Sequence, residues 1–395
     1  MTMVHQQAFS VNFKYDVVFT RDLFAPGNTA LRDVLPKTGT PARMAFFIDS
    51  GVQNAWPELA DTIMGWARDN KDFVLLPERP MTVPGGEESK NDLMFVQRIT
   101  HQLQRMQICR HSYAVAIGGG AMLDAVGLAA AVFHRGVRLI RVPTTVLSQN
   151  DSGIGVKNSV NLDGVKNLIG SFAPPYAVLN DSLFLKTLDD RDWYGGISEA
   201  FKVAIIKDAE FLNELERRAD ALRDHDLEAM EVVVKRCAEL HLDHIATAGD
   251  AFEMGSARPL DFGHWAAHKL ESMTHFELRH GEAVAIGIAL DVYIAARLGF
   301  ISESDRDRIC NAMRRCGMKL WCPALEKRSG SGSYMVLNGL EEFRQHLGGK
   351  LTLTMPDGIG RKAEIHTLAP EIVADGIVWL SNARKQPSSS RTPSA

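Results

Sequence analysis

Residues 113–120 read YAVAIGGG, an apolar run that leads directly into three glycines. The small-residue stretch AMLDAVGLAAAVF follows and is typical of a buried helix. Glycines at such a junction let the backbone approach a pyrophosphate, and the helix N-terminus favours the anion. The spacing is not GxGxxG, so the ordinary dinucleotide fingerprint is absent and a plain tight turn is the alternative.

Strand-like and helical segments alternate through the first 180 residues. The apolar runs at 44–49, 139–143 and 174–181 are typical of buried strands in a parallel sheet. After residue 184 we expect helices almost throughout to about residue 320, at 196–207, 209–222, 226–247, 262–273, 281–297 and 303–316. The sequence therefore predicts an α/β fold with a Rossmann-like parallel-sheet domain over 1–182 and a mainly α-helical domain over 183–384. A disordered tail is expected over 385–395.

Composition narrows the class of protein. The net charge of −4 over 395 residues gives no basic surplus, so we expect no nucleic acid partner. No apolar run approaches the ~18 residues of a membrane span, and the N-terminus has no signal-peptide pattern. Five cysteines without CxxC spacing argue against a disulfide scaffold and favour a cytoplasmic protein.

Four histidines lie close together at 264, 268, 275 and 280. On a helix His264 and His268 share one face, and His280 is followed by a second apolar run. Zinc takes imidazole nitrogen readily, and Glu199 in SEAFK offers a third ligand upstream. Ordinary polar or core histidines are the alternative interpretation.

The segment at 151–172, DSGIGVKNSVNLDGVKNLIGSF, is rich in Gly, Asn and Lys. We interpret it as a hairpin over a cleft, in which Lys157, Lys166 and Asn167 donate hydrogen bonds to an anionic ligand. A solvated polar loop is the alternative, but the apolar residues within each turn argue against it.

Several strings together resemble the sugar phosphate cyclase superfamily, whose best-known member is 3-dehydroquinate synthase. They are PGGEESK, GGGAMLDAVG, HRGV, PTT, the 151–172 segment, FLKTLDDRD, GGISEAFK, FGHWAAHKLE and RHGEAVAIG. The resemblance spans roughly residues 45–290, and PLDFGHWAAHKLE is also similar to the branch encoded in the bacterial ebo operon. It implies the dehydroquinate synthase-like fold, a homodimer, NAD, and Zn²⁺ or Co²⁺.

The resemblance also implies roles for particular residues. The metal ligands would be Glu199, His264 and His280. NAD would contact Asp49, Glu87, Lys90, Gly118, Gly119, Gly120, Asp124, Thr144, Thr145, Lys166, Thr187 and Leu188. Substrate would contact Asp151, Lys157, Asn167, Lys202, Arg258 and His268, and Arg135 would reach the substrate phosphate of the neighbouring subunit.

The implied reaction is a phosphate-eliminating carbon–oxygen lyase reaction on a seven-carbon sugar phosphate. The steps are transient oxidation of an alcohol, β-elimination of phosphate, reduction, ring opening and aldol closure. NAD is thus recycled within one turnover, and a small sugar phosphate is the expected partner.

Three positions depart from 3-dehydroquinate synthase, in which a Lys, an Arg and an Asn hold the substrate carboxylate. The chain has Ala257 at the Arg position, with Arg258 displaced by one, and Asp261 at the Asn position; the Lys position falls near His241. Asp261 beside a substrate carboxylate is an unfavourable like-charge pair. We therefore expect sedoheptulose 7-phosphate ahead of the carboxylated 3-deoxy-arabino-heptulosonate 7-phosphate.

Two other functions stay open. A metal-dependent polyol dehydrogenase of the glycerol dehydrogenase type shares the fold and the glycine turn, but such enzymes usually use Asp with two His. A non-catalytic binding protein would be expected to have lost a metal ligand or Lys157, and neither is lost.

Overall fold

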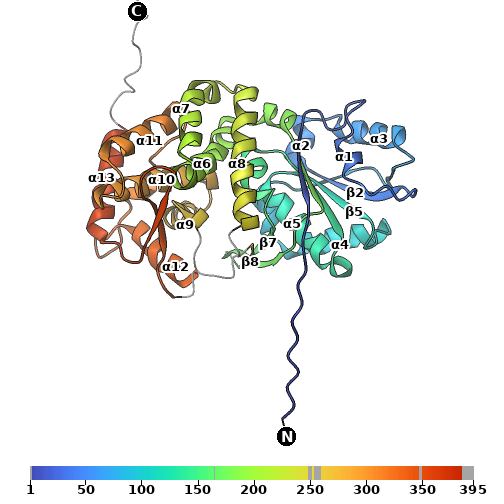
Figure 1. Ribbon diagram of the computed structural model, residues 1–395, viewed down its shortest axis with the longest axis horizontal. Coiled ribbons are helices and arrows are strands. Elements are labelled where there is room, and N and C mark those ends of the chain that lie inside the picture. Colours follow the sequence, from blue (N-terminus) through green and yellow to red (C-terminus); the bar gives the residue numbers. More distant parts are fainter. Residues whose placement is uncertain (1, 164, 248–250, 253–258, 347–348, 385–395) are drawn as a thin grey trace, which may run out of the picture. The chain divides into compact units, whose positions relative to one another are not determined.

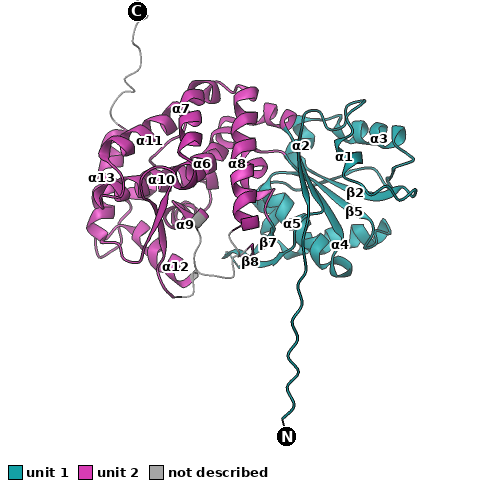
Figure 2. Ribbon diagram, viewed as in Figure 1, with its two compact units in different colours: residues 1–143, 156–181 teal, residues 144–155, 182–395 magenta. Residues whose placement is uncertain are grey.

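The computed structural model describes residues 2–163, 165–247, 251–252, 259–346 and 349–384. The chain forms two compact units (Figure 2). Unit 1 comprises Met1–Pro143 and Val156–Asp181, and unit 2 comprises Thr144–Gly155 and Ser182–Ala395. The sequence placed a single boundary near residue 182, whereas the contacts assign the short segment Thr144–Gly155 to unit 2. The expected tail at 385–395 lies outside the described residues.

Unit 1 is built on a parallel sheet, which confirms the predicted α/β class (Figure 1). The strand order is β1-β9-β6-β5-β2-β3, and β4 also pairs with β2. Every residue of β5 is buried, as expected for a parallel strand covered on both faces. The strands are β1 (Asp16–Thr20), β2 (Ala42–Asp49), β3 (Val74–Leu75), β4 (Met81–Val83), β5 (Tyr113–Gly118), β6 (Arg138–Pro143) and β9 (Ala177–Asp181).

The helices of unit 1 follow the strands in the alternating order that the sequence indicated. The apolar faces of α4 and α5 pack with β2 and β5 in one core. An antiparallel hairpin, β7 (Lys157–Leu162) with β8 (Val165–Phe172), packs on α5 and lies outside the main sheet. The helices are α1 (Ala30–Asp33), α2 (Ser50–Ala55), α3 (Leu59–Asp69), α4 (Leu93–Arg105) and α5 (Gly120–Val132).

Unit 2 is mainly helical and is centred on α10, which packs against α6, α9, α11 and α13 (Figure 1). From Ala283 to Ala295 every residue of α10 is buried. The helices are α6 (Asp190–Lys207), α7 (Ala209–Arg223), α8 (Leu227–Thr247), α9 (His264–Met273), α10 (His280–Arg297), α11 (Glu303–Arg315), α12 (Asn338–His346) and α13 (Pro370–Ala383). A small hairpin joins β10 (Leu353–Pro356) to β11 (Lys362–Ile365).

Within the described residues, every helix is either too short or too polar to span a bilayer.

Candidate active site

Three side chains of unit 2 converge at the helices α6, α9 and α10. Glu199 lies within α6, whereas His264 and His280 are the first residues of α9 and α10. Glu199 Oε1 lies 3.8 Å from His264 Nε2 and 3.9 Å from His280 Nε2. Ligands bonded to one tetrahedral zinc at ~2.0–2.1 Å lie roughly 3.3 Å apart. A small inward movement would therefore complete a metal site from these residues.

Close backbone contacts bring these helices together. A Cβ built on Gly281 would lie 2.2 Å from the carbonyl oxygen of Gly195, so only glycine allows α10 to approach α6 this closely. Glu199 lies one turn after Gly195, and His280 directly precedes Gly281. The Gly195–Gly281 contact therefore sets the separation of Glu199 and His280.

The two histidines are oriented by acceptors at their second ring nitrogens. The Nδ1 of His264 lies 3.1 Å from the carbonyl oxygen of Phe262, and the Nδ1 of His280 lies 3.1 Å from Glu271 Oε2. Each contact favours a proton on Nδ1 and leaves Nε2 directed toward Glu199. Burial, followed by the Lys202 charge, holds the pKa of His264 well below its usual value, so the ring is neutral as a metal ligand requires.

His268 completes a cluster of three imidazoles. Its ring centroid is 5.4 Å from that of His264 and 5.8 Å from that of His280. The side chains of His268, Glu271 and His280 also form a second grouping of potential ligands, which shares His280 with the first. The Glu199 grouping fits a metal better, because Glu199 is fully buried and its Oε1 accepts no hydrogen bond from the described residues. A buried carboxylate oxygen without such a donor is costly unless a cation approaches it.

A buried charge network continues from this cluster. Lys202 forms an ion pair with Glu199 one helical turn away, and both side chains are almost fully buried. Burial disfavours the ammonium, but the charges of Glu199 and Asp151 outweigh it and raise the pKa of Lys202, with Asp261 adding to the effect. Burial likewise opposes ionisation of Asp151, yet Lys202 and His241 lower its pKa. His241 Nδ1 lies 2.8 Å from Asp151 Oδ1.

Unit 1 carries the other half of the expected residues at the carboxyl ends of β2 and β5. Asp49 ends β2, and its carboxylate accepts the backbone N–H of Gly51 at 2.7 Å. Burial raises the pKa of Asp49, while the amides of Gly51, Val52, Gly119 and Gly86 oppose that shift. A Cβ on Gly118 would lie 2.9 Å from Asp49 Cβ, so only glycine lets the end of β5 pack this closely on Asp49. A glycine cradle at a helix N-terminus fits a dinucleotide pyrophosphate.

Further expected residues of unit 1 form a polar network between α5 and the β7–β8 hairpin. The Nζ of Lys90 donates to Asp124 Oδ2 at 2.7 Å and to Asn167 Oδ1 at 2.6 Å. Lys166 Nζ lies 3.7 Å from Glu87 Oε1. The resemblance implied that Glu87, Lys90, Asp124 and Lys166 contact NAD and that Asn167 contacts the substrate. In the structure Asn167 is hydrogen-bonded within the same network. Lys157 is exposed at the start of β7.

The remaining expected residues lie in several places. In unit 2, Thr144 is buried, and the side chain of Thr145 shares a hydrogen bond with that of Ser148. Thr187 Oγ1 donates a hydrogen bond to the carbonyl of Phe184, and Leu188 is the next residue in the chain. Ala257 and Arg258 lie outside the described residues.

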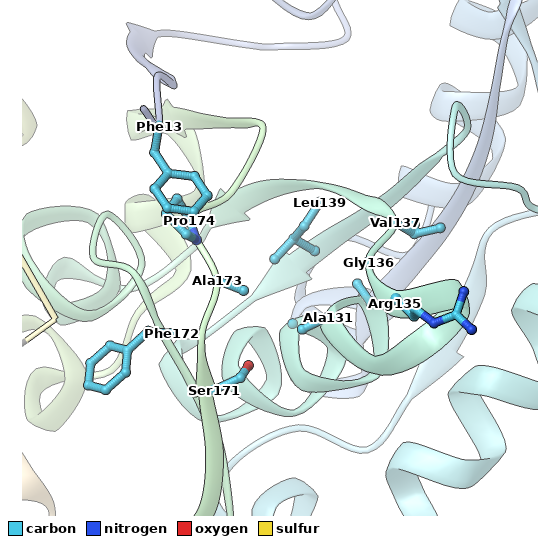
Figure 3. Close-up of a pocket in the computed structure, with 12 residues that line it drawn as sticks. Phe13, Ala131, Arg135, Gly136, Val137, Leu139, Ser171, Phe172, Ala173 and Pro174 are labelled. Carbon is cyan, nitrogen blue, oxygen red and sulfur yellow. The ribbon is translucent and has the colours of Figure 1, made fainter. Parts of the chain in front are cut away.

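Arg135 lines a cavity of about 330 Å³ within unit 1 (Figure 3). His134 and Arg135 both have left-handed backbones, with φ of 51° and 63°, where the chain leaves α5. The guanidinium of Arg135 and the ring of Phe172 lie on opposite sides of this cavity (Figure 3). Among the described residues, the hydrogen bonds of the Lys90–Asp124–Asn167 network do not include Arg135.

Two acidic residues near the histidines escaped the sequence interpretation. Glu271 lies seven residues after His264, a spacing that places both on one helical face and was available as a signal. Asp291 is a lone acid within the apolar run AIGIALDVYIA, which is also visible in the sequence. Their partners depend on the packing of α9 against α10, which no local pattern gives.

Two sequence profiles match adjoining parts of the chain: 3-dehydroquinate synthase N-terminal over residues 80–195 and 3-dehydroquinate synthase C-terminal over 196–334. A 3-dehydroquinate synthase from Shewanella frigidimarina is 35% identical over 280 residues, covering 71% of this chain and 76% of that protein. One from Nitrosospira multiformis is 35% identical over 299 residues, covering 74% and 78%.

Among solved structures, a 2-epi-5-epi-valiolone synthase from Streptomyces hygroscopicus subsp. jinggangensis with NAD⁺ and Zn²⁺ bound superposes with a TM-score of 0.84. It is 26% identical, and the match covers 96% of this chain and 100% of that one. A 2-deoxy-scyllo-inosose synthase with NAD⁺ and Co²⁺ gives a TM-score of 0.74 at 22% identity, covering 92% and 97%. The latter likeness shows the fold.

Proposed function

This chain belongs to the 3-dehydroquinate synthase family of sugar phosphate cyclases, and we propose that its substrate is a neutral seven-carbon ketose phosphate such as sedoheptulose 7-phosphate. We expect the carboxylated 3-deoxy-arabino-heptulosonate 7-phosphate to be the poorer substrate. The observation that carries it is the contact of His241 with Asp151, 2.8 Å apart beside Lys202.

The charges around Lys202 favour a neutral ligand. The carboxylates of Glu199, Asp151 and Asp261 all raise the pKa of Lys202. The positive charge of Lys202 is therefore already compensated by negative charges of the protein. In 3-dehydroquinate synthase, by the resemblance, a Lys and an Asn meet the substrate carboxylate where this chain has His241 and Asp261. A carboxylate brought there would face like charges in a largely buried site, which is unfavourable. Hydroxyl groups can instead donate to these acids.

We propose that Glu199, His264 and His280 hold Zn²⁺ or Co²⁺. We also propose that NAD lies on the residues of the Asp49 cradle and on Glu87, Lys90, Asp124 and Lys166 of the polar network, while Asn167 of that network is left to the substrate. When bound, NAD supplies reversible oxidation of a secondary alcohol, and the metal polarises that alcohol and the resulting ketone.

The chain's own residues then position the substrate and balance its charge. Lys202, kept protonated by its acidic neighbours, donates hydrogen bonds to substrate oxygens, and Asp151 accepts from substrate hydroxyls. By the resemblance, Lys157, Asn167 and His268 would hold the phosphate while it leaves by β-elimination. The leaving phosphate carries the proton, so no further protein base is required in that step. Arg258 is assigned to the substrate by the resemblance alone.

Arg135 is proposed to act across a homodimer on the phosphate bound by the partner copy. Its place at the end of α5, beside a cavity rather than in the Lys90 network, is compatible with a role outside its own subunit. We further propose a cytoplasmic location, since the five cysteines of the sequence have no CxxC spacing.

A polyol dehydrogenase is the second candidate, but less of the chain supports it. The metal grouping uses Glu199 rather than the usual Asp, and the polar β7–β8 hairpin would have no phosphate to bind. Net accumulation of NADH with glycerol would favour this alternative.

Phosphate release tests the proposal. The NAD- and zinc-loaded protein is assayed with both heptulose phosphates, and we expect release from sedoheptulose 7-phosphate. The double variant His241→Lys, Asp261→Asn should shift kcat/KM toward the carboxylated sugar by at least ~10-fold, because it removes one acid and adds one cation. Glu364→Gln, at an exposed position of β11, is the control. Turnover of the carboxylated sugar alone by the unaltered protein would contradict the proposal.

A further inference from the structure

We propose that Asp291, which is no part of the metal-binding set, is a positioning residue that holds His264 in place through both of its chain neighbours. The inference rests on the proposed metal site and concerns how this chain builds it. Asp291 lies near the middle of α10, eleven residues after His280.

The two oxygens of Asp291 reach the residues on either side of His264. The backbone N–H of Gly263 donates to Oδ2 at 2.9 Å, and the indole Nε1 of Trp265 donates to Oδ1 at 2.8 Å. All three groups are buried, with Asp291 and Trp265 each 1% exposed. One carboxylate therefore ties both the backbone before His264 and the side chain after it to α10.

The start of α9 depends on this tie. Gly263 precedes the helix in a left-handed conformation with φ of 81°, and it offers no side chain to cap the helix. A Cβ on Gly263 would lie 2.8 Å from the backbone nitrogen of Ile288, so the turn is pressed against α10. Asp291 accepts the backbone N–H of this N-cap residue, which in a capping box is bonded by the side chain of the third helical residue. His264 is the first residue of the helix that begins there.

The chemistry of Asp291 argues against an incidental core residue. Every other residue of α10 from Ala283 to Ala295 is apolar or glycine, except for the hydroxyl of Tyr293. Burial raises the pKa of Asp291 to about 7, although the hydrogen bonds from Trp265 and Gly263 oppose the shift. The chain therefore keeps an acid at a position where burying the ionised carboxylate costs free energy. The hydrogen bonds that Asp291 accepts from Gly263 and Trp265 explain why an acid is present at this position.

The consequence for the metal is geometric. His264 Nε2 faces Glu199 from 3.8 Å while its Nδ1 meets the carbonyl of Phe262. Freeing the Gly263 turn would let the imidazole move relative to Glu199. Outer contacts of this kind typically affect metal affinity by 10- to 100-fold.

Two variants test the role, with metal affinity rather than activity as the readout. Asp291→Asn keeps the shape of the side chain, but its amide NH₂ cannot accept one of the two hydrogen bonds that Gly263 and Trp265 donate. Trp265→Phe removes the indole donor. The control is Trp193→Phe, which deletes an equally buried indole hydrogen bond of 2.7 Å to Leu222, away from His264. Apo-protein is titrated with Zn²⁺ against a chromophoric chelator, and the visible spectrum of the Co²⁺-loaded protein is recorded.

We expect zinc binding at least ~10-fold weaker in Asp291→Asn and Trp265→Phe, together with an altered Co²⁺ spectrum, and neither change in Trp193→Phe. If Asp291→Asn does not fold, Trp265→Phe decides. Unaltered affinity and spectrum in a folded Trp265→Phe would overturn the positioning role while leaving the metal site intact. Absence of stoichiometric metal binding in the unaltered protein would instead overturn the metal site and this inference with it.

Discussion

At the scale of single residues, Glu271 is expected to matter through His280. Its carboxylate is buried and lies 3.1 Å from His280 Nδ1. Replacing it in Glu271→Gln should weaken zinc binding by roughly 10-fold, because an amide holds the ring and its tautomer less firmly. Glu342→Gln, which breaks the exposed ion pair with Lys269, should leave affinity unchanged. Equal zinc affinities of these two variants in a competition titration would contradict the role.

The cysteines are expected to differ sharply in reactivity. The hydroxyl of Ser112 lowers the pKa of exposed Cys109, whereas burial raises the pKa of Cys310 and Cys316 to about 12. A thiol reagent near neutral pH should therefore modify Cys109 first and leave the other two unmodified. Ser112→Ala should slow the reaction of Cys109, as followed by peptide mass spectrometry. Modification of Cys310 in the native protein at a comparable rate would refute this ranking.

Much of the site could be predicted residue by residue, because its chemistry is concentrated in short strings. His264, His268 and His280 come from one stretch, and the structure brings their rings together. The grouping of His264 and His280 with Glu199 is present in the fold, while its role as a metal centre stays a prediction. Glu271 and Asp291 were missed because their value depends on which side chains face each other across α9 and α10. Sequence spacing reports a face of one helix but not the register between two.

At the scale of elements, the approach of α10 to α6 is expected to be indispensable. In Gly281→Ala the new methyl would lie 2.2 Å from the Gly195 carbonyl oxygen, so α10 must move and His280 with it. Overpacking of this kind costs roughly 1–3 kcal/mol. Gly65→Ala within α3 meets nothing within 4 Å and should be neutral or stabilising. Urea unfolding and zinc titration of both variants check this, and equal behaviour would be inconsistent with a close helix contact.

The elements themselves were mostly predictable, because apolar periodicity dominates them. Strand β5 and helix α5 follow directly from YAVAIGGG and the apolar run after it, and α10 from the run after His280. Helix α13 was not predicted, although Pro370 at its first position and apolar residues at 373, 377 and 380 were available signals. Short strands such as β3 and β4 gave weaker patterns, since two or three residues define no period.

At the scale of the whole molecule, composition and alternation were enough to predict an α/β unit and a helical unit. They could not assign Thr144–Gly155 to unit 2, because that grouping arises from tertiary contacts. Asn150 Nδ2 donates to the carbonyl of Gly196 at 2.8 Å, and His241 on α8 meets Asp151. A segment adjacent to β6 in sequence is thereby held by helices far along the chain.

The distribution of the proposed metal ligands over the molecule leads to a prediction for its unfolding. Glu199, His264 and His280 all belong to unit 2, so metal removal should destabilise that unit first. Metal at ~100 times its Kd stabilises by about 2.7 kcal/mol, which a strong chelator would abolish. Hydrogen exchange should then accelerate in α9 and α10 but not in β5 or α5.

Two variants make this test specific. Glu199→Gln should abolish the shift of the melting temperature by chelator, because the buried acid is no longer available to the metal. Glu214→Gln, on α7 in the same unit, loses ion pairs with Arg217 and Arg218 but should keep the full response. A chelator shift of equal size in both variants would show that the stabilising metal binds elsewhere. Faster exchange spread evenly over β5 and α10 would show instead that the two units unfold as one.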